Sequence, residues 1–264
     1  MVRERGLGTR TVARARSTAE APSFLRRGGE GEARADSVAR EVGAVFQKGQ
    51  KHFPRASLGT ALEAATTEVA DYGLEAWGAR LEKDLRDVVQ SAATTSFVSG
   101  AEAVDLSTAG RGWANDYCGE LGRAATGGGQ KAARGAEEEV QWMNAEVSQI
   151  VQKGVDKSLR PEDIVAEVDF LLASTATGRR GKRIAWSVVF RWWHAGRDWR
   201  YRREGATHKI WHLSTGVDNC PICLGNEDAG EIEAALTFPS GHSHPLAHPW
   251  CHCWNEYTGL PKRR

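Results

Sequence analysis

The chain has 264 residues, of which 41% are hydrophobic, and its 35 Lys and Arg side chains nearly balance its 34 Asp and Glu. This length allows one large domain or two modest ones, because domains usually have about 100–200 residues. No stretch approaches the ~18 uninterrupted apolar residues of a membrane-spanning helix, and no apolar run follows the N-terminal arginines as a secretory signal requires. Five cysteines, four of them within the last 45 residues, do not fit a disulfide-stapled secreted domain. We therefore expect a soluble protein made in a reducing compartment.

The near balance of charge hides strong segregation along the chain. Residues 1–35 carry a net charge of +4 and residues 36–178 carry −8, whereas residues 179–209 carry +8 and residues 210–264 carry −3. A local excess of eight positive charges attracts phosphate or an acidic partner. The alternative is a solvated helix face that pairs with the acidic middle segment, and composition leaves both interpretations open.

The first two thirds of the chain divide into an arm and a helical region. Residues 1–35 are rich in Arg, Gly, Glu and Ala and poor in large apolar side chains, so we expect a flexible arm. In residues 36–178, helical periodicity predicts helices over Asp36–Phe53, Leu58–Val98, Glu137–Val155 and Pro161–Ala173. Residues 107–136 are interrupted by glycines, and the run Gly127–Gly129 predicts a linker or turn. That run lacks the spacing of a phosphate-binding loop.

Residues 180–204 predict a basic helix in which arginines alternate with tryptophans. We expect Trp192 and Trp199 to lie in the core, with arginine stems covering its edge. The alternative is that the rings stack on bases, as they do in proteins that bind single strands. The cations of this helix are candidates for weak DNA contact without sequence preference, which salt would weaken. They are Arg179, Arg180, Lys182, Arg183, Arg191, Arg197, Arg200, Arg202 and Arg203.

The sharpest motif lies near the C-terminus and combines cysteine with histidine. Cys220 and Cys223 form a C-x2-C knuckle, and after 24 intervening residues come His248, Cys251 and Cys253. Two sulfurs from the knuckle and two ligands from the second turn satisfy the tetrahedral N/S coordination of structural zinc. His248 and Cys251 would converge from one turn, whereas Cys251 and Cys253 would point to one side of an extended backbone. We predict one structural zinc ion bound by Cys220, Cys223, His248 and Cys251, with Cys253 as the substitute ligand.

Other interpretations of this region stay open at this point. The thiols could form two disulfides, which a reducing compartment disfavours, or remain inert and buried. His242 and His244 offer a second set of donors, but we expect them to face solvent in their Gly/Pro/Ser-rich loop. A His-rich-loop nuclease would need a metal site with an open position, and no acidic partners cluster here. Cys118 is isolated and is predicted to be a small buried apolar residue.

The resulting fold class is α+β, with a helical N-terminal region followed by a small domain of one helix and short strands that ends in a zinc-stapled turn. The strand is expected over Lys209–Ser214, with Trp211 and Leu213 on its buried face. Few large aliphatic residues follow it, and domains this small commonly need a metal or disulfide staple. The predicted divisions are an arm (1–35), a helical region (36–178), a small domain (179–257) and a tail (258–264).

A longer pattern covers residues 179–257, about a third of the chain. An Arg/Ile/Ala helix leads to a K-x-W strand, a D-x-C-x-x-C knuckle, F-P and a terminal H-P-x-C-x-C. The residues that carry it are Arg183, Ile184, Ala185, Gly196, Gly205, Lys209, Trp211, Asp218, Cys220, Cys223, Gly230, Phe238, Pro239, Pro245, His248, Pro249, Cys251 and Cys253. This pattern resembles the phage minor head protein family, the phage-head morphogenesis or Mu F-like proteins. The chain departs from it at Trp186-Ser187, where the family usually has Thr-Glu, and at His252, where it has Arg.

The resemblance implies a structural virion protein without enzymatic activity. Such a protein is made in the cytoplasm of the bacterial host and lies in few copies inside the capsid near the portal vertex. It acts in head morphogenesis, with a part in DNA packaging or ejection. Its partners would be portal and capsid proteins, with DNA contacted through residues 179–203, and neither a membrane nor a small-molecule substrate is implied. The alternative function is a zinc-containing nucleic-acid-binding protein or a His-rich-loop nuclease.

Overall fold

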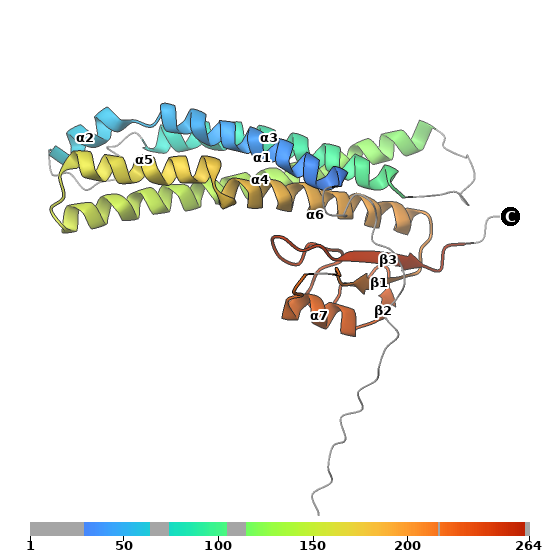
Figure 1. Cartoon of the computed structure of the whole chain (residues 1–264). Helices are drawn as coiled ribbons and strands as arrows, with labels where there is room; N and C mark the ends of the chain where they lie inside the picture. The colour runs from blue at the N-terminus through green and yellow to red at the C-terminus, as the bar shows by residue number, and fades with distance from the viewer. Residues whose placement is uncertain (1–28, 64–73, 105–114, 216, 262–264) are drawn as a thin grey trace, which may run out of the picture.

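A computed structural model of the chain describes residues 29–63, 74–104, 115–215 and 217–261. Within these ranges the protein is mostly helical and carries a small antiparallel sheet near the C-terminus (Figure 1). The elements are α1 (Glu30–Lys51), α2 (Arg55–Glu63), α3 (Leu74–Glu102), α4 (Asn115–Asp156), α5 (Pro161–Thr177), α6 (Arg179–Arg203), β1 (His208–His212), α7 (Pro221–Asp228), β2 (Glu231–Glu233) and β3 (Trp254–Thr258). The α+β expectation is confirmed. None of the described helices combines the length and the apolarity needed to cross a bilayer.

The helix α1 begins inside the segment that we expected to be an arm. Its first turn carries Glu30 and Glu32 and its last turn carries Lys48 and Lys51, an arrangement that favours both ends of a helix dipole. Ala35 is already buried in the core, so the arm prediction is wrong for residues 30–35. Residues 1–28 of the predicted arm lie outside the described part of the chain.

The remaining predicted helices are found with shifted boundaries. The stretch from Leu58 to Val98 corresponds to α2 and α3, and residues 64–73 between them are outside the described ranges. The helix predicted over Glu137–Val155 is the second half of α4, and Pro161 begins α5 as its fixed φ favours.

The prediction of a linker or turn at Gly127–Gly129 is wrong, because these glycines lie inside α4. This helix has 42 residues and is therefore about 63 Å long. A Cβ on Gly128 would lie 2.9 Å from Cζ3 of Trp192, and a Cβ on Gly129 would meet Thr94 of α3. Glycine costs a helix about 1 kcal/mol relative to alanine, but here it lets α4 approach α3 and α6 closely.

The helices form an elongated bundle, and the C-terminal module, residues 208–258, lies against α6 (Figure 1). Helix α3 packs on both α4 and α6, and α1 packs on α6, α5 and α3. One buried core contains Phe46 of α1, Val189 of α6 and Trp211 of β1. The predicted domain boundary before Arg179 therefore coincides with the start of α6 but not with a break in packing.

The sheet of the module has the order β2-β1-β3, with β1 antiparallel to both neighbours. Lys209 pairs with Ile232 of β2 and with Tyr257 of β3, which fixes the register of the three strands. The predicted strand is confirmed, although it spans His208–His212. Trp211 is fully buried, and Leu213 lies just beyond the strand and is partly buried.

The helices α3 and α6 meet at a pair of glycines. A Cβ on Gly196 would overlap the carbonyl oxygen of Phe97, and a Cβ on Gly100 would overlap the carbonyl oxygen of Trp193. Both obstacles are backbone atoms, which cannot move aside as a flexible side chain can. The two helices therefore approach until backbone touches backbone, and this contact sets the position of α6.

We expect Gly196→Ala to destabilise the protein by about 1–3 kcal/mol, as overpacking of a tight core does. The melting temperature should fall by about 2–4 °C for each kcal/mol, measured by circular dichroism. The matched control is Gly127→Ala in α4, because nothing lies within 4 Å of a Cβ at that position. The control should be neutral or stabilise by up to ~1 kcal/mol. Equal stability of the two variants would show that the α3–α6 contact is not tight.

Candidate metal centre

The first half of the candidate centre is built by the start of α7. Cys220 is the N-cap of this helix, and its Sγ accepts a hydrogen bond from the backbone N–H of Cys223 at 3.4 Å. Pro221 occupies the first turn, where its fixed φ suits the helix and its missing N–H costs nothing. This capping turn brings the sulfurs of Cys220 and Cys223 to the same end of α7.

The second half is a tight turn that precedes β3. The backbone N–H of Cys251 donates to the carbonyl oxygen of His248 at 3.2 Å. Trp250 adopts a φ of 65°, a left-handed conformation uncommon outside glycine, and so closes the turn. Cys251 and Cys253 are both buried, and β3 begins directly after them at Trp254.

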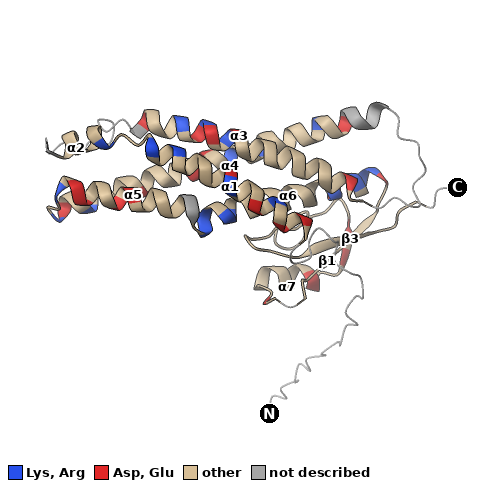
Figure 2. Cartoon of the chain, turned by 45° about the horizontal axis from the view of Figure 1, so that its top comes forward, with Lys and Arg blue, Asp and Glu red and all other residues tan. Residues whose placement is uncertain are grey.

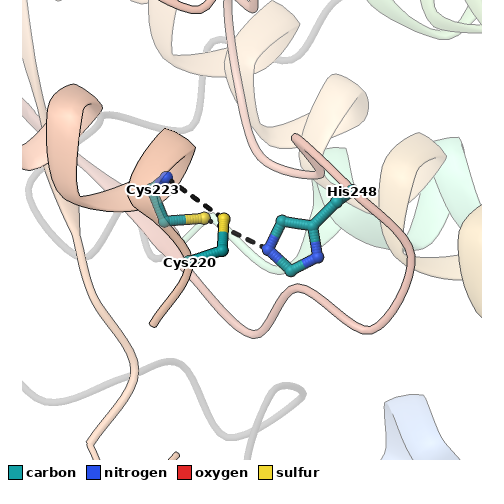
Figure 3. A group of neighbouring side chains, drawn as sticks. All are labelled: Cys220, Cys223 and His248. Atoms are coloured by element: carbon teal, nitrogen blue, oxygen red, sulfur yellow. Dashed lines mark hydrogen bonds between the residues drawn. The ribbon is translucent and has the colours of Figure 1, made fainter. Parts of the chain in front are cut away.

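The two halves meet at the sulfur of Cys223. Its Sγ lies 3.3 Å from Nε2 of His248 and 3.7 Å from Sγ of Cys251. Cys223 belongs to two groups, one with Cys220 and His248 and one with Cys251 and Cys253, and within each group the donor atoms lie within 4.8 Å of one another. Figure 3 shows Cys220, Cys223 and His248 directed toward one another. Each of the five donors expected from the sequence thus belongs to one of two groups that share Cys223, and among the described residues no four of them form a single group.

The separation of the Cys223 and Cys251 sulfurs fits two ligands of one tetrahedral metal ion. Metal–sulfur bonds of about 2.3 Å at a tetrahedral angle place two sulfurs about 3.8 Å apart, close to the 3.7 Å between Cys223 and Cys251. The four cysteines are free thiols, so no disulfide joins them. The cluster can thus hold a metal ion, and Cys223 belongs to every donor group.

The imidazole of His248 is oriented for such a role. Its Nδ1 lies 2.7 Å from the carbonyl oxygen of Pro249, and a proton on Nδ1 donates to that oxygen. The lone pair of Nε2 then points toward Cys223. Histidine ligands of metals commonly have their second nitrogen held by a carbonyl or carboxylate in this way.

Hydrogen bonding within the cluster shifts the pKa values of its thiols. The hydrogen bond from Cys223, followed by one from Cys253, lowers the pKa of Cys251, and the same contact with Cys251 raises the pKa of Cys223. The two pKa values move in opposite directions because a second thiolate would place two negative charges side by side in a buried site. A divalent cation removes this repulsion and allows both thiols to ionise.

His242 and His244 do not join these donor groups. The Nδ1 of His242 contacts the hydroxyl and carbonyl of Ser240, and the Nδ1 of His244 lies 2.6 Å from the Pro245 carbonyl. Both side chains are partly buried, so the expectation that they face solvent is wrong. Burial lowers the pKa of His244. The side chain of Cys118, in α4, lies outside the described part of the chain.

The aromatic face of α6 differs from the single stripe that we expected. Trp186 and Trp193 are buried, whereas Trp192 and Trp199 are only partly buried. The expectation of Trp192 and Trp199 as core residues is therefore met only in part, because both rings pack against the core from its edge and neither is fully buried. The reason is that α6 is enclosed by α1 and α3 on one side and by the module on the other, so its buried surface is wider than one stripe.

Two of the candidate DNA-contacting cations are buried and unavailable to a phosphate. The guanidinium of Arg197 lies 4.9 Å from the ring centre of Trp193, and Arg200 pairs with Glu204 at 3.0 Å. Arg197 and Arg200 are 7% and 2% exposed, which corrects their assignment as DNA contacts. Their place near the end of α6, where the module covers the helix, explains the burial.

Three further cations of α6, which are not themselves buried, form ion pairs. Arg180 pairs with Glu139 of α4 at 2.6 Å, Arg202 pairs with Asp198, and Arg203 pairs with Glu120 of α4. Figure 2 shows basic and acidic residues interspersed along the helices. The expected pairing with the acidic middle segment is thus found for Arg180 and Arg203. The other four cations, Arg179, Lys182, Arg183 and Arg191, form no ion pair within the described ranges.

A buried polar network that sequence reasoning missed joins α6 to the sheet. Lys209 of β1 is fully buried, and its ammonium donates to the carbonyl oxygen of Ser243 at 2.8 Å and lies 4.0 Å from Asp198. The hydroxyl of Tyr257 donates to Asp198 at 2.8 Å. Burial lowers the pKa of Lys209. The sequence did contain one indication that Lys209 is buried. Side chains alternate between the two faces of a strand, so Lys209 shares a face with the buried Trp211.

No family model, no curated protein and no solved structure matches the chain. Its function is therefore inferred from the donor cluster and from the surface of the helical bundle.

We expect the protein purified without chelator to retain one divalent metal ion per chain, and Cys223→Ser to lose it, because Cys223 takes part in both donor groups. His248→Gln should weaken retention about 10-fold or more, as loss of one ligand does. The matched control is His242→Gln, which lies outside the cluster and should retain the metal. Metal content by atomic emission and proteolysis of residues 208–258 are the measurements. A Cys223→Ser variant with full metal content would contradict the site.

Metal binding should release protons at neutral pH. The raised pKa of Cys223 keeps this thiol protonated in the metal-free protein, and a metal-bound sulfur is a thiolate. Calorimetric titration of the chelator-treated protein with zinc, in two buffers of different ionisation enthalpy, should give different apparent enthalpies. Identical enthalpies would mean that the ligands were already deprotonated.

Proposed function

We propose that the protein is a structural minor capsid protein of a tailed phage, acting in head morphogenesis near the portal and binding one structural zinc ion. The observation that carries the proposal is the convergence of the D-x-C-x-x-C knuckle and the H-P-x-C-x-C turn on one cluster, at Cys223. These two motifs are the most specific part of the resemblance to the phage minor head protein family. A metal-binding module of the kind found in that family would require these two motifs to lie close together.

Zinc is the metal that best suits this donor set. Thiolate and imidazole ligands favour zinc over magnesium or calcium, which take oxygen donors. Cys223, Cys251 and Cys253 are each about 1–2% exposed, whereas Cys220 and His248 are partly exposed, so most of the cluster is closed to a substrate. The module has one two-turn helix and three short strands, and small domains of this kind often depend on a metal for stability. A closed site supports a structural role rather than a catalytic one.

Two residues at which the chain departs from the family pattern, Trp186 and His252, contact each other. The rings of Trp186 and His252 have centroids 4.7 Å apart, and Trp186 also packs on Trp250 at 5.2 Å. The position of the usual Thr-Glu therefore faces the position of the usual Arg. These ring contacts hold α6 against the metal-binding turn.

The helical bundle supplies surfaces for portal and capsid proteins, and α6 supplies cations for DNA. Arg179, Lys182, Arg183 and Arg191 remain for phosphate contact after the buried and paired arginines are removed. Such contacts would be weak, independent of sequence and sensitive to salt. This narrows the DNA-binding surface from the whole of residues 179–203 to four side chains.

The alternative is a zinc-containing nucleic-acid-binding protein that acts outside a virion, or a His-rich-loop nuclease. A nuclease needs a metal with an open coordination position. Among the described residues no carboxylate joins either donor group, and His248 is better used as a ligand of the closed cluster. Association with phage particles distinguishes a head protein from a free nucleic-acid-binding protein.

The proposal is tested in the phage or prophage that encodes the chain. We expect a tagged copy to be present in density-purified particles, in far smaller amount than the major capsid protein, measured by quantitative mass spectrometry. Deletion of the gene should give heads that are misassembled or fail to deliver DNA. Absence from particles, together with an unchanged titre after deletion, would refute the proposal. Cleavage of plasmid DNA by the purified protein in Mg²⁺, Mn²⁺ or Zn²⁺ would favour the nuclease.

A further inference from the structure

A groove of about 320 Å³ lies between α4 and α6. Its α6 wall carries Arg183, Ser187 and Arg191 at intervals of four residues, and Lys131 stands on the α4 wall. Residues four apart on a helix share one face, so these three side chains form a row about 12 Å long. The groove thus has a cationic row on one wall and a further cation on the other.

The cations of this groove are not neutralised by the protein. Lys131, Arg183 and Arg191 form no ion pair in the part of the chain that the structure describes. Glu139, which also lines the groove, is already paired with Arg180 at 2.6 Å. Glu138 is the remaining carboxylate in the lining, and Lys131, Arg183 and Arg191 outnumber it.

The rest of the groove is suited to a planar ring. The partly buried indole of Trp192 lines it, held on its far side by Gly128, and small residues of α4 form part of the lining. Ala132 and Ala136 leave room beside the indole. An aromatic ring flanked by unpaired cations is the combination with which proteins bind single strands of nucleic acid, by stacking bases and neutralising phosphates.

We propose that this α4–α6 groove binds a single strand of DNA, with phosphates at Lys131, Arg183 and Arg191 and a base against Trp192. The inference rests on the DNA contact in the proposed function and specifies its substrate and its place. A recessed slot between two helices admits one strand, whereas a duplex would meet the outward-facing Arg179 and Lys182. Lys131 extends the site beyond the basic helix.

The test is fluorescence anisotropy of the full, metal-containing chain with a labelled oligothymidylate at low salt. Arg183→Gln combined with Arg191→Gln should weaken binding roughly tenfold and lower the slope of log affinity against log salt by about 1.4. The matched control removes the same charge far from the groove, as Lys153→Gln with Lys157→Gln around the exposed C-terminal end of α4, and should change the affinity less than about twofold. Thermal unfolding of each variant checks that the bundle is intact.

Two single variants separate the groove from the general charge of α6. Lys131→Gln should weaken binding although it lies on α4, and Ser187→Glu should do so by placing a negative charge in the cationic row. Equal losses in the two double variants, a duplex that competes as well as the oligothymidylate, or no binding at low salt would overturn the inference. None of these outcomes changes the result expected when phage particles are analysed for the protein. The DNA-binding inference can therefore fail while the proposed function stands, and the reverse.

Discussion

The backbone contact between α3 and α6 at Gly100 and Gly196 is the constraint on which the other features depend. It fixes α6 against the bundle at a distance that no larger residue permits. The opposite side of α6 then carries the module, because Trp186 packs on the metal-binding turn and Asp198 reaches Lys209 and Tyr257. A shift of α6 would therefore move the support of the donor cluster and the wall of the cationic groove together.

The metal-binding cluster and the bundle stabilise the module in different ways. The bundle provides one apolar surface through Trp186 and Phe190, whereas the cluster ties α7 to the turn before β3. Both contacts hold the turn before β3, because Trp186 packs on Trp250 and His252 between the donor residues. The buried cysteines Cys223, Cys251 and Cys253 belong to the same core as the helices, so the metal-binding cluster and the bundle support one continuous packed interior.

Local chemistry was predictable from the sequence, and long-range packing was not. The donor spacing, the strand at Trp211 and the helix start at Pro161 each depend on neighbouring residues, and the structure agrees with them. The glycines at 127–129 were misinterpreted because their use depends on Trp192 and Thr94, which are distant in sequence. Arg197 and Arg200 were assigned to the surface for the same reason: their burial depends on how the module folds back over α6, which periodicity does not reveal.

The buried lysine of β1 has a consequence for folding specificity. A slip of one residue would turn every side chain of this strand to the other face, moving Lys209 away from Ser243 and Asp198 and placing Ile210 opposite the carboxylate. An isolated buried charge is strongly unfavourable, so a register of β1 that leaves Asp198 without Lys209 would destabilise the folded protein. The network of Lys209, Asp198 and Tyr257 thus favours the observed register of the three strands over registers shifted by one residue.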